Sequence, residues 1–337
     1  MGQVTTIGLD VAKKVLQVHG VDATGATMLR RQLKRHQVEG FFAKLPRCVV
    51  GIEACGSGHY WGRRLRALGH DARLLPPSYV KPYVRRNKHD PADAEALCEA
   101  VGRPRTRLVP VKSEAQQAAA AVHRVRDKLI GQRIQLQNML RGQMAEFGWV
   151  VPKGPAHVTE LVAKLDEAGS VPAPLAAALR RIVGLLAALE REIAAIEQAI
   201  VAAHREDPRS RRLATIPGFG PILSSAMAAR AVEPERFGSG RDFAAWLGLT
   251  PKESSSGGKS RLGGISKQGD ATLRRLLVSG AQAVLNGRRA QNDPWLARLL
   301  REKPRMVAAV ALANKMARIA WAVMVREEDF RRAPAAA

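Results

Sequence analysis

The chain has 337 residues, an apolar fraction of 46% and a formal net charge of +24. This apolar fraction supports packed cores and excludes an intrinsically disordered protein, and the length allows two or three domains. The positive charge exceeds what solubility requires, so it predicts a polyanionic partner, of which nucleic acid is the commonest.

A membrane surface is the competing polyanion, and the sequence argues against it. No run reaches the ~18 apolar residues of a spanning helix and no signal peptide is present, so we expect a cytoplasmic protein without a membrane partner. The 3 cysteines are odd in number and lack metal-type spacing, which indicates a reducing compartment and no zinc site. Aromatic residues make up only 4% of the chain, which argues against extensive stacking of bases on aromatic side chains.

Residues 1–111 have the pattern of an α/β domain. The first three β-rich runs form a meander, and helical and β-rich runs then alternate. This order predicts a mixed sheet with helices on its faces. The expected strands cover residues 4–9, 15–21, 27–33, 48–52 and 72–75, and the expected helices cover residues 38–45 and 58–68.

The remainder of the chain is predicted to be all-α. Leucine and isoleucine recur at three- and four-residue spacing in the region 112–206, which is typical of a coiled-coil arm, an oligomerisation element or a packed bundle. A C-terminal domain is expected over residues 207–330, followed by a frayed tail at 331–337. The expected helices cover residues 113–147, 158–167, 174–204, 273–285 and 307–325.

A glycine-containing turn begins the C-terminal domain. Residues 213–221 read Leu-Ala-Thr-Ile-Pro-Gly-Phe-Gly-Pro and lead into an alanine-rich helix. The pattern resembles a helix-hairpin-helix motif, in which glycines such as Gly218 and Gly220 let backbone N–H groups approach a phosphate. An ordinary helix-helix turn is the alternative interpretation.

A loop rich in serine and glycine follows, from Ser254 to Gly258, and Asp270 then has the position of a helix N-cap. The small residues predict that this first half of the stretch 250–277 forms neither helix nor strand. It is either a solvated basic linker or a serine hydroxyl surrounded by cations that hold phosphate. The candidate nucleic-acid contacts are Lys259, Arg261, Lys267 and Arg274.

Four acidic residues stand out in the strongly basic N-terminal region. Asp10 and Glu53 each follow a predicted strand, and Asp90 and Asp93 flank a Pro-Ala pair at a predicted helix start. Each acid alone has a structural explanation, as a turn cap, a surface charge or a helix N-terminus.

Taken together, the four acids suggest a metal site. Acids at the ends of neighbouring strands can face each other, and acids at i and i+3 share one face of a helix. Four gathered carboxylates repel one another unless a cation neutralises them, and such oxygen ligands suit Mg²⁺ or Mn²⁺. Metal ions held in this way assist phosphoryl transfer.

The ordered set of motifs resembles a known family. Ile-Gly-Leu-Asp10, Gly-Ile-Glu53 and Lys-His-Asp90-Pro-Ala-Asp93 match the Asp-Glu-Asp-Asp pattern of RuvC-like, ribonuclease-H-fold domains. The motifs Ile-Pro-Gly-Phe-Gly-Pro, Leu-Gly-Leu-Thr-Pro and Ser-Gly-Gly-Lys match the C-terminal domain of the insertion-sequence transposases with this tetrad, the 110/1111 group. The resemblance runs in order over nearly the whole chain and is weakest in the helical middle.

This resemblance implies a DNA recombinase that moves its own element. It implies metal binding by Asp10, Glu53, Asp90 and Asp93, and a nucleophilic serine that corresponds to Ser256, with Ser255 as the alternative. It also implies a non-coding guide RNA that pairs with donor and target DNA, and dimers that assemble into tetramers through the helical middle.

Two other functions remain open at the level of sequence. The chain could be a metal-dependent nuclease or junction resolvase in which water attacks, with Ser256 structural. It could also be a non-catalytic nucleic-acid-binding protein whose acids only cap helices and turns.

Overall fold

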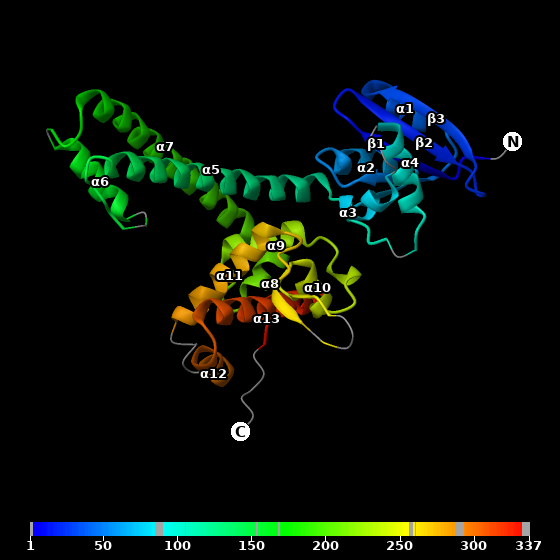
Figure 1. Cartoon of the computed structure of the whole chain (residues 1–337). Coiled ribbons are helices and arrows are strands. Elements are labelled where there is room, and N and C mark those ends of the chain that lie inside the picture. Colours follow the sequence, from blue (N-terminus) through cyan, green and yellow to red (C-terminus); the bar gives the residue numbers. More distant parts are fainter. Residues whose placement is uncertain are drawn as a thin grey trace. The chain divides into compact units, whose positions relative to one another are not determined.

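The computed structural model describes residues 3–84, 90–104, 106–152, 154, 156–167, 169–255, 259, 261–287 and 293–331, with the backbone alone at positions 90 and 156. The chain forms two compact units, Met1–Ala115 and Gln116–Ala337. Figure 1 shows the elements of both units, each of which is described by itself below. The division at residues 111 and 206 into three domains stays a prediction.

A five-stranded mixed sheet forms the centre of the N-terminal unit, in the order β3-β2-β1-β4-β5 (Figure 1). The first three strands are antiparallel neighbours, whereas β4 and β5 run parallel to β1. The predicted meander and mixed sheet are therefore confirmed. The strands are β1 (Thr6–Val11), β2 (Val15–Val21), β3 (Thr27–Lys34), β4 (Val49–Glu53) and β5 (Asp71–Leu75).

Helices pack on both faces of this sheet. On one face, fully buried Leu9 and Ile52 pack with Phe42 and Leu65, which come from α1 and α2. On the other face, α4 packs across β1, β2 and β4. The elements are η1 (Arg35–Gln37), α1 (Val38–Phe42), α2 (Gly58–Ala67), α3 (Pro77–Val80), η2 (Lys81–Tyr83) and α4 (Asp90–Val101).

Strand β1 differs from its predicted range in a way that matters for the site. Its ladder with β2 runs from Thr6↔Val21 to Val11↔Leu16, so Asp10 lies inside the strand and not beyond its end. The physical reason is the hairpin partner, which extends the hydrogen-bonded ladder past the last apolar residue. Asp10 therefore has a regular strand backbone.

Three helices begin the C-terminal unit. Leu140 and Met144 of α5 are fully buried against Leu161 of α6 and Leu179 of α7. The Arg126 guanidinium of α5 also bonds the Glu197 carboxylate of α7 at 2.5 Å. The helices are α5 (Glu114–Ala145), α6 (Ala156–Asp166) and α7 (Ala173–Glu206), and their coiled-coil character stays a prediction.

In the described part of the C-terminal unit, six further helices build one hydrophobic core. Phe243, Leu277 and Ala313 are fully buried within it and come from α10, α11 and α13. The elements are α8 (Pro208–Ala214), α9 (Pro221–Arg230), η3 (Pro234–Arg236), α10 (Gly240–Trp246), α11 (Ala271–Asn286), α12 (Pro294–Glu302) and α13 (Arg305–Arg326).

Helix α13 is the one helix in the described part of the chain that is long and apolar enough, by length and composition, to cross a membrane. Its apolar side chains have another explanation. Ala308, Leu312, Met316 and Val323 are buried in the core of the C-terminal unit, where α13 packs against α8, α10 and α11. Such burial accounts for the hydropathy of α13.

A short hairpin flanks the serine-glycine loop. Strand β6 (Pro251–Glu253) pairs antiparallel with β7 (Leu262–Ile265), and the Ser254 N–H donates to the Arg261 carbonyl at 2.9 Å. The prediction that this stretch forms neither helix nor strand is therefore wrong for the two strands. Their low local propensity is offset because each strand satisfies the backbone hydrogen bonds of the other.

Candidate active site

Two of the predicted acids lie side by side at one edge of the sheet. In the parallel ladder between β1 and β4, Leu9 pairs with Ile52, and the next residues of the two strands are Asp10 and Glu53. Both strands run in the same direction, so the two carboxylates project from the same edge. The sequence-based hypothesis required that the two strands be neighbours, and β1 and β4 are.

Two glycines allow α4 to approach the sheet next to these acids. A Cβ at Gly8 would lie 1.9 Å from the Ala94 carbonyl oxygen, and one at Gly51 would lie 2.9 Å from the Leu97 carbonyl oxygen. Because side chains alternate along a strand, Asp10 projects to the same face as Gly8, and Glu53 to the same face as Gly51. This face is the one that α4 covers.

We expect Gly8→Ala to separate α4 from the sheet, because its new methyl group would overlap a backbone carbonyl of the helix. The predicted cost is about 1–3 kcal/mol in the free energy of unfolding, together with a loss of activity. Urea unfolding of the full chain measures it. The matched control is Gly40→Ala in α1, where an added Cβ meets no atom within 4 Å, so equal stability of both variants would contradict the prediction.

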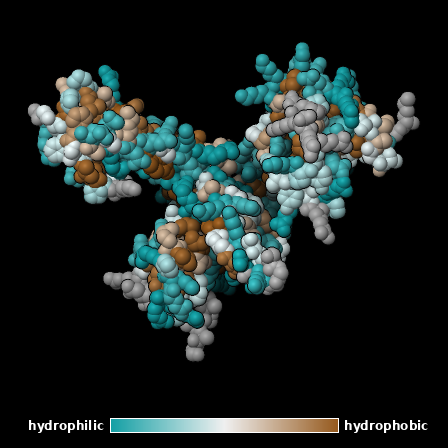
Figure 2. Space-filling model, in the orientation of Figure 1, coloured by the Kyte–Doolittle hydropathy of each residue, from teal (hydrophilic) through white to brown (hydrophobic). Residues whose placement is uncertain are grey.

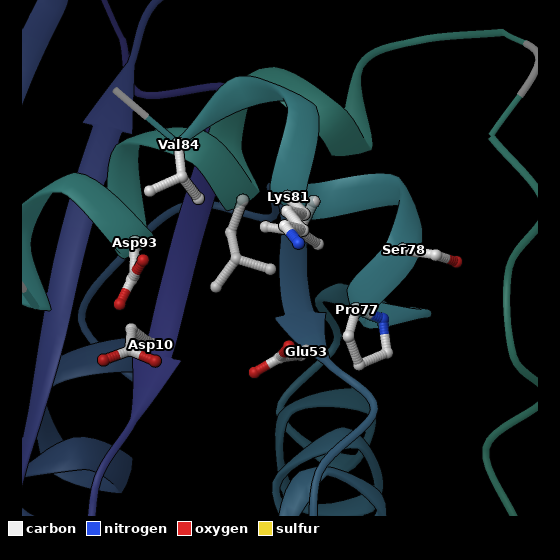
Figure 3. A pocket seen from close by; sticks show the side chains of 9 residues that line it. Asp10, Glu53, Pro77, Ser78, Lys81, Val84 and Asp93 are labelled. Atoms are coloured by element: carbon white, nitrogen blue, oxygen red, sulfur yellow. The ribbon is translucent and has the colours of Figure 1, made fainter. Parts of the chain in front are cut away.

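Asp93 completes the group from the first turn of α4. Figure 3 shows the Asp93 carboxylate directed toward Asp10, and the Glu53 carboxylate directed toward Asp10 from the end of β4. The three acids line a pocket of about 470 Å³. Of the described residues that line it, Lys81 is the basic one, and the others are Pro77, Ser78, Val80, Val84 and Leu97.

The donor set of this pocket fits a hard divalent cation. It consists of carboxylate oxygens, the ligands that Mg²⁺ and Mn²⁺ prefer. Within the ranges that the structure describes, no three acids, histidines or cysteines are yet close enough to form a preformed metal cluster.

The structure describes the remaining predicted catalytic residues only in part. Asp90 is the first residue of α4, one helical turn before Asp93, but its side chain lies outside the described part. Ser256 lies outside the described residues altogether. Its neighbour Ser255 donates a hydrogen bond from Oγ to the Glu253 carboxylate at 2.8 Å and accepts one from the Arg261 N–H at 3.3 Å.

The predicted nucleic-acid contacts differ in their surroundings. Lys259, Arg261 and Lys267 are exposed near the hairpin. Arg274 donates to the carbonyls of Leu247 and Gln268 at 2.9 and 2.8 Å, so it holds the backbone of the turn before α11. For all four side chains, a contact with phosphate stays a prediction.

The two turn glycines also play different parts. Gly218 has a φ of +86°, and a Cβ there would lie 2.8 Å from the Gly280 carbonyl oxygen, so packing against α11 already requires glycine. Gly220 is the N-cap of α9, and nothing lies within 4 Å of the position of its absent Cβ. The helix-hairpin-helix interpretation of this turn stays a prediction.

Sequence reasoning missed Gly8, Gly51 and Lys81 as parts of the site. Isolated glycines inside strand patterns are a known signal of close backbone approach and could have identified the first two. Lys81 carries no comparable signal, because only the position of η2 beside the strand ends brings it to the pocket.

The sheet order and the carboxylates at its edge are consistent with a RuvC-like domain of the Asp-Glu-Asp-Asp type. Comparison with known proteins agrees. A family model for DEDD transposases of IS110 elements, described as Transposase, matches residues 7–148. A second model, described as Transposase IS116/IS110/IS902 family, matches residues 210–295.

Individual relatives extend this similarity over nearly the whole chain. The chain is 50% identical to a "Probable family 20 transposase" of Pseudomonas aeruginosa, over 96% of this chain and 98% of that protein. It is 39% identical to the transposase for insertion sequence element IS1328 of Yersinia enterocolitica (98% and 99% covered) and 34% identical to that for IS1111A of Coxiella burnetii (98% and 92%). The chain belongs to the IS110/IS1111 family of insertion-sequence transposases.

Proposed function

We propose that this transposase cleaves and exchanges DNA strands by a metal-assisted attack of Ser256 on a DNA phosphodiester. The proposal rests on one observation. The side chains of Asp10, Glu53 and Asp93 line the same pocket. Acids from two strands and a helix converge there, although each alone has an ordinary structural explanation. Convergence on one pocket favours a shared chemical role.

The reaction is a transesterification. The Ser256 oxygen forms a bond to phosphorus, the bond from phosphorus to the 3′ oxygen breaks, and the hydroxyl proton passes through a base to that leaving oxygen. The product is a phosphoserine link to the 5′ end and a free 3′ hydroxyl. Attack of another 3′ hydroxyl on this link rejoins the strands and releases the serine, so no external energy source is needed.

A serine hydroxyl at its ordinary pKa is a poor nucleophile, which explains why a metal site is required. A bound Mg²⁺ or Mn²⁺ would supply Lewis acidity toward the serine and phosphate oxygens. Asp10, Glu53 and Asp93 would hold it, with Asp90 as the fourth ligand of the tetrad. Backbone packing at Gly8 and Gly51 positions these carboxylates.

A non-coding guide RNA and a homo-oligomer complete the proposal. The charge of +24 supports binding of RNA as well as DNA. Figure 2 shows hydrophobic residues on the surface of the α5–α7 region, and the exposed apolar side chains there include Ile134, Met139 and Leu185. Exposed apolar patches of this kind support assembly into dimers, and of dimers into tetramers.

Titration with magnesium tests the proposal and separates it from a binding function. We expect DNA cleavage to require Mg²⁺ or Mn²⁺, because the acids repel one another without a cation. DNA binding should persist in EDTA, since it depends on basic residues elsewhere. Cleavage at an unchanged rate in EDTA would contradict a metal mechanism, and a complete lack of cleavage with either metal would favour the non-catalytic alternative.

The water-dependent nuclease is separated by its product. A hydrolase releases both DNA ends, whereas the serine mechanism leaves one end attached to protein. Denaturing gel electrophoresis of the reaction distinguishes the two outcomes, and co-purified RNA of defined sequence would identify the guide.

A further inference from the structure

A second cavity in the C-terminal unit lies between the start of α10 and the middle of α13. Its volume is about 570 Å³, within the ~300–1,000 Å³ range of ligand sites. Among the described residues that line it, the charged ones are the cations Arg241, Lys315 and Arg318. We propose that this cavity is a binding site for the phosphodiester backbone of a nucleic acid, separate from the carboxylate pocket of the N-terminal unit.

The fold brings the three cations to one region of the surface. Lys315 and Arg318 share one face of α13 with Ile319 and Ala322, since they lie three, four and seven residues apart. Helix α10 approaches this face closely, because a Cβ at Gly240 would lie only 3.1 Å from the Arg318 carbonyl oxygen. The close approach brings Arg241 to the same cavity.

The other walls of the cavity are neutral. The Trp321 indole is anchored by its Nε1–H, which donates to the Pro234 carbonyl at 2.9 Å, and its ring offers an apolar wall. The Ser239 hydroxyl donates to the Asp242 carboxylate at 2.9 Å. Asp242 is not among the described residues that line the cavity.

Two of the cations have no partner within the described residues. Neither the Arg241 nor the Arg318 side chain makes a hydrogen bond or ion pair there, and the Lys315 ammonium lies 4.2 Å from the Trp295 ring centroid. Arg230 of the same unit, by contrast, forms an ion pair with Asp270 at 2.8 Å. Gathered like charges repel one another, and an anion in the cavity would remove that repulsion.

The surroundings favour a polymer over a small anion. Arg241 and Arg318 are exposed, so a strand can enter the cavity and leave it. Phosphate groups repeat along a nucleic acid, and planar guanidinium groups bind them in bidentate fashion. The net charge of +24 adds long-range attraction for such a polymer. This inference rests on the nucleic-acid chemistry of the proposed function.

The test is the double variant Arg241→Gln/Arg318→Gln in the full chain. A matched control, Arg301→Gln/Lys303→Gln, removes the same charge from exposed positions that do not line the cavity. Fluorescence anisotropy measures binding to labelled duplex DNA and to single-stranded RNA of the same sequence, over a range of salt concentrations. EDTA is present, so strand cleavage does not affect the measurement.

We expect the cavity variant to lower the magnitude of the salt slope by ~0.9 per lost contact on duplex DNA, or ~0.7 on single-stranded RNA. The variant and the wild type are expected to bind duplex DNA equally at about 1 M salt. A salt slope that is lower by ~0.9 then makes binding of the variant roughly eightfold weaker per lost contact at about 0.1 M salt. The control should change the slope by less. A change with DNA alone or with RNA alone assigns the strand that occupies the cavity, and both outcomes support the proposal.

Equal effects of the two double variants would overturn the inference and leave the proposed function intact. The inference would also be overturned if the cavity variant bound inorganic phosphate more weakly than the wild type but bound both nucleic acids equally well. The site would then take only a small anion. If the wild-type chain bound neither nucleic acid, both the inference and the proposed function would fail. The single variants Arg241→Gln and Arg318→Gln, with thermal unfolding by circular dichroism, keep the test decisive if the double variant misfolds.

Discussion

Replacing Asp10 by asparagine is expected to abolish DNA cleavage while DNA binding is retained. The amide keeps the shape of the side chain but removes one negative charge from the pocket that Glu53 and Asp93 share. If the pocket supplies several kcal/mol of transition-state stabilisation through a bound metal, the rate should fall on the order of 10³-fold. Cleavage assays with excess Mg²⁺, beside binding measurements, provide the comparison.

The matched control for this experiment is Asp71→Asn. Asp71 lies on β5 of the same sheet, does not line the pocket, and forms a partly exposed ion pair with Arg73 at 2.6 Å. Loss of such a pair costs little, about 0–1 kcal/mol, so cleavage should stay near wild type. The proposal would be untenable if Asp10→Asn cleaved DNA within tenfold of the wild-type rate.

Ser256→Ala is expected to eliminate the covalent protein–DNA adduct completely. Alanine has no hydroxyl, so no bond to phosphorus can form at this position. The adduct is measured as labelled DNA that co-migrates with protein on a denaturing gel. Metal binding and DNA binding should be unchanged, because the carboxylates and the basic residues are intact.

Ser255→Ala is the control that distinguishes the two serines. The Ser255 hydroxyl bonds Glu253 and accepts from the Arg261 N–H, so we expect its loss to weaken the end of the hairpin while the adduct still forms. Loss of the adduct in Ser255→Ala alone would move the nucleophile to that residue. Persistence of strand exchange and adduct in both variants would eliminate a serine mechanism.

Much of the N-terminal unit could be predicted from the sequence. Strand β2 begins and ends at the predicted residues, and the Asp-Pro-Ala-Asp pattern marks the start of α4 within one residue. These elements are set by local patterns of apolar residues and by proline chemistry, which act within a few positions of the chain. The four acids were proposed as site residues for the same reason, since each is adjacent to a predictable element.

Features that depend on distant partners could not be predicted. Asp10 lies inside β1 because β2 pairs with it, and β6 exists because β7 satisfies its hydrogen bonds. From the sequence, Arg274 was predicted to be one more cation of a basic loop. In the structure, its guanidinium donates hydrogen bonds to two backbone carbonyls. No local pattern encodes which carbonyls a long side chain will reach.

The sequence by itself determined the charge of +24, the order of the strands along the chain and the identity of the acids. Tertiary structure alone decided that Asp10, Glu53 and Asp93 share one pocket, and that Arg241 meets Lys315 and Arg318 in another. The physical reason is the same in both sites. Glycines at positions 8, 51 and 240 let a helix approach another backbone closely, and this close packing joins residues that are far apart in the chain.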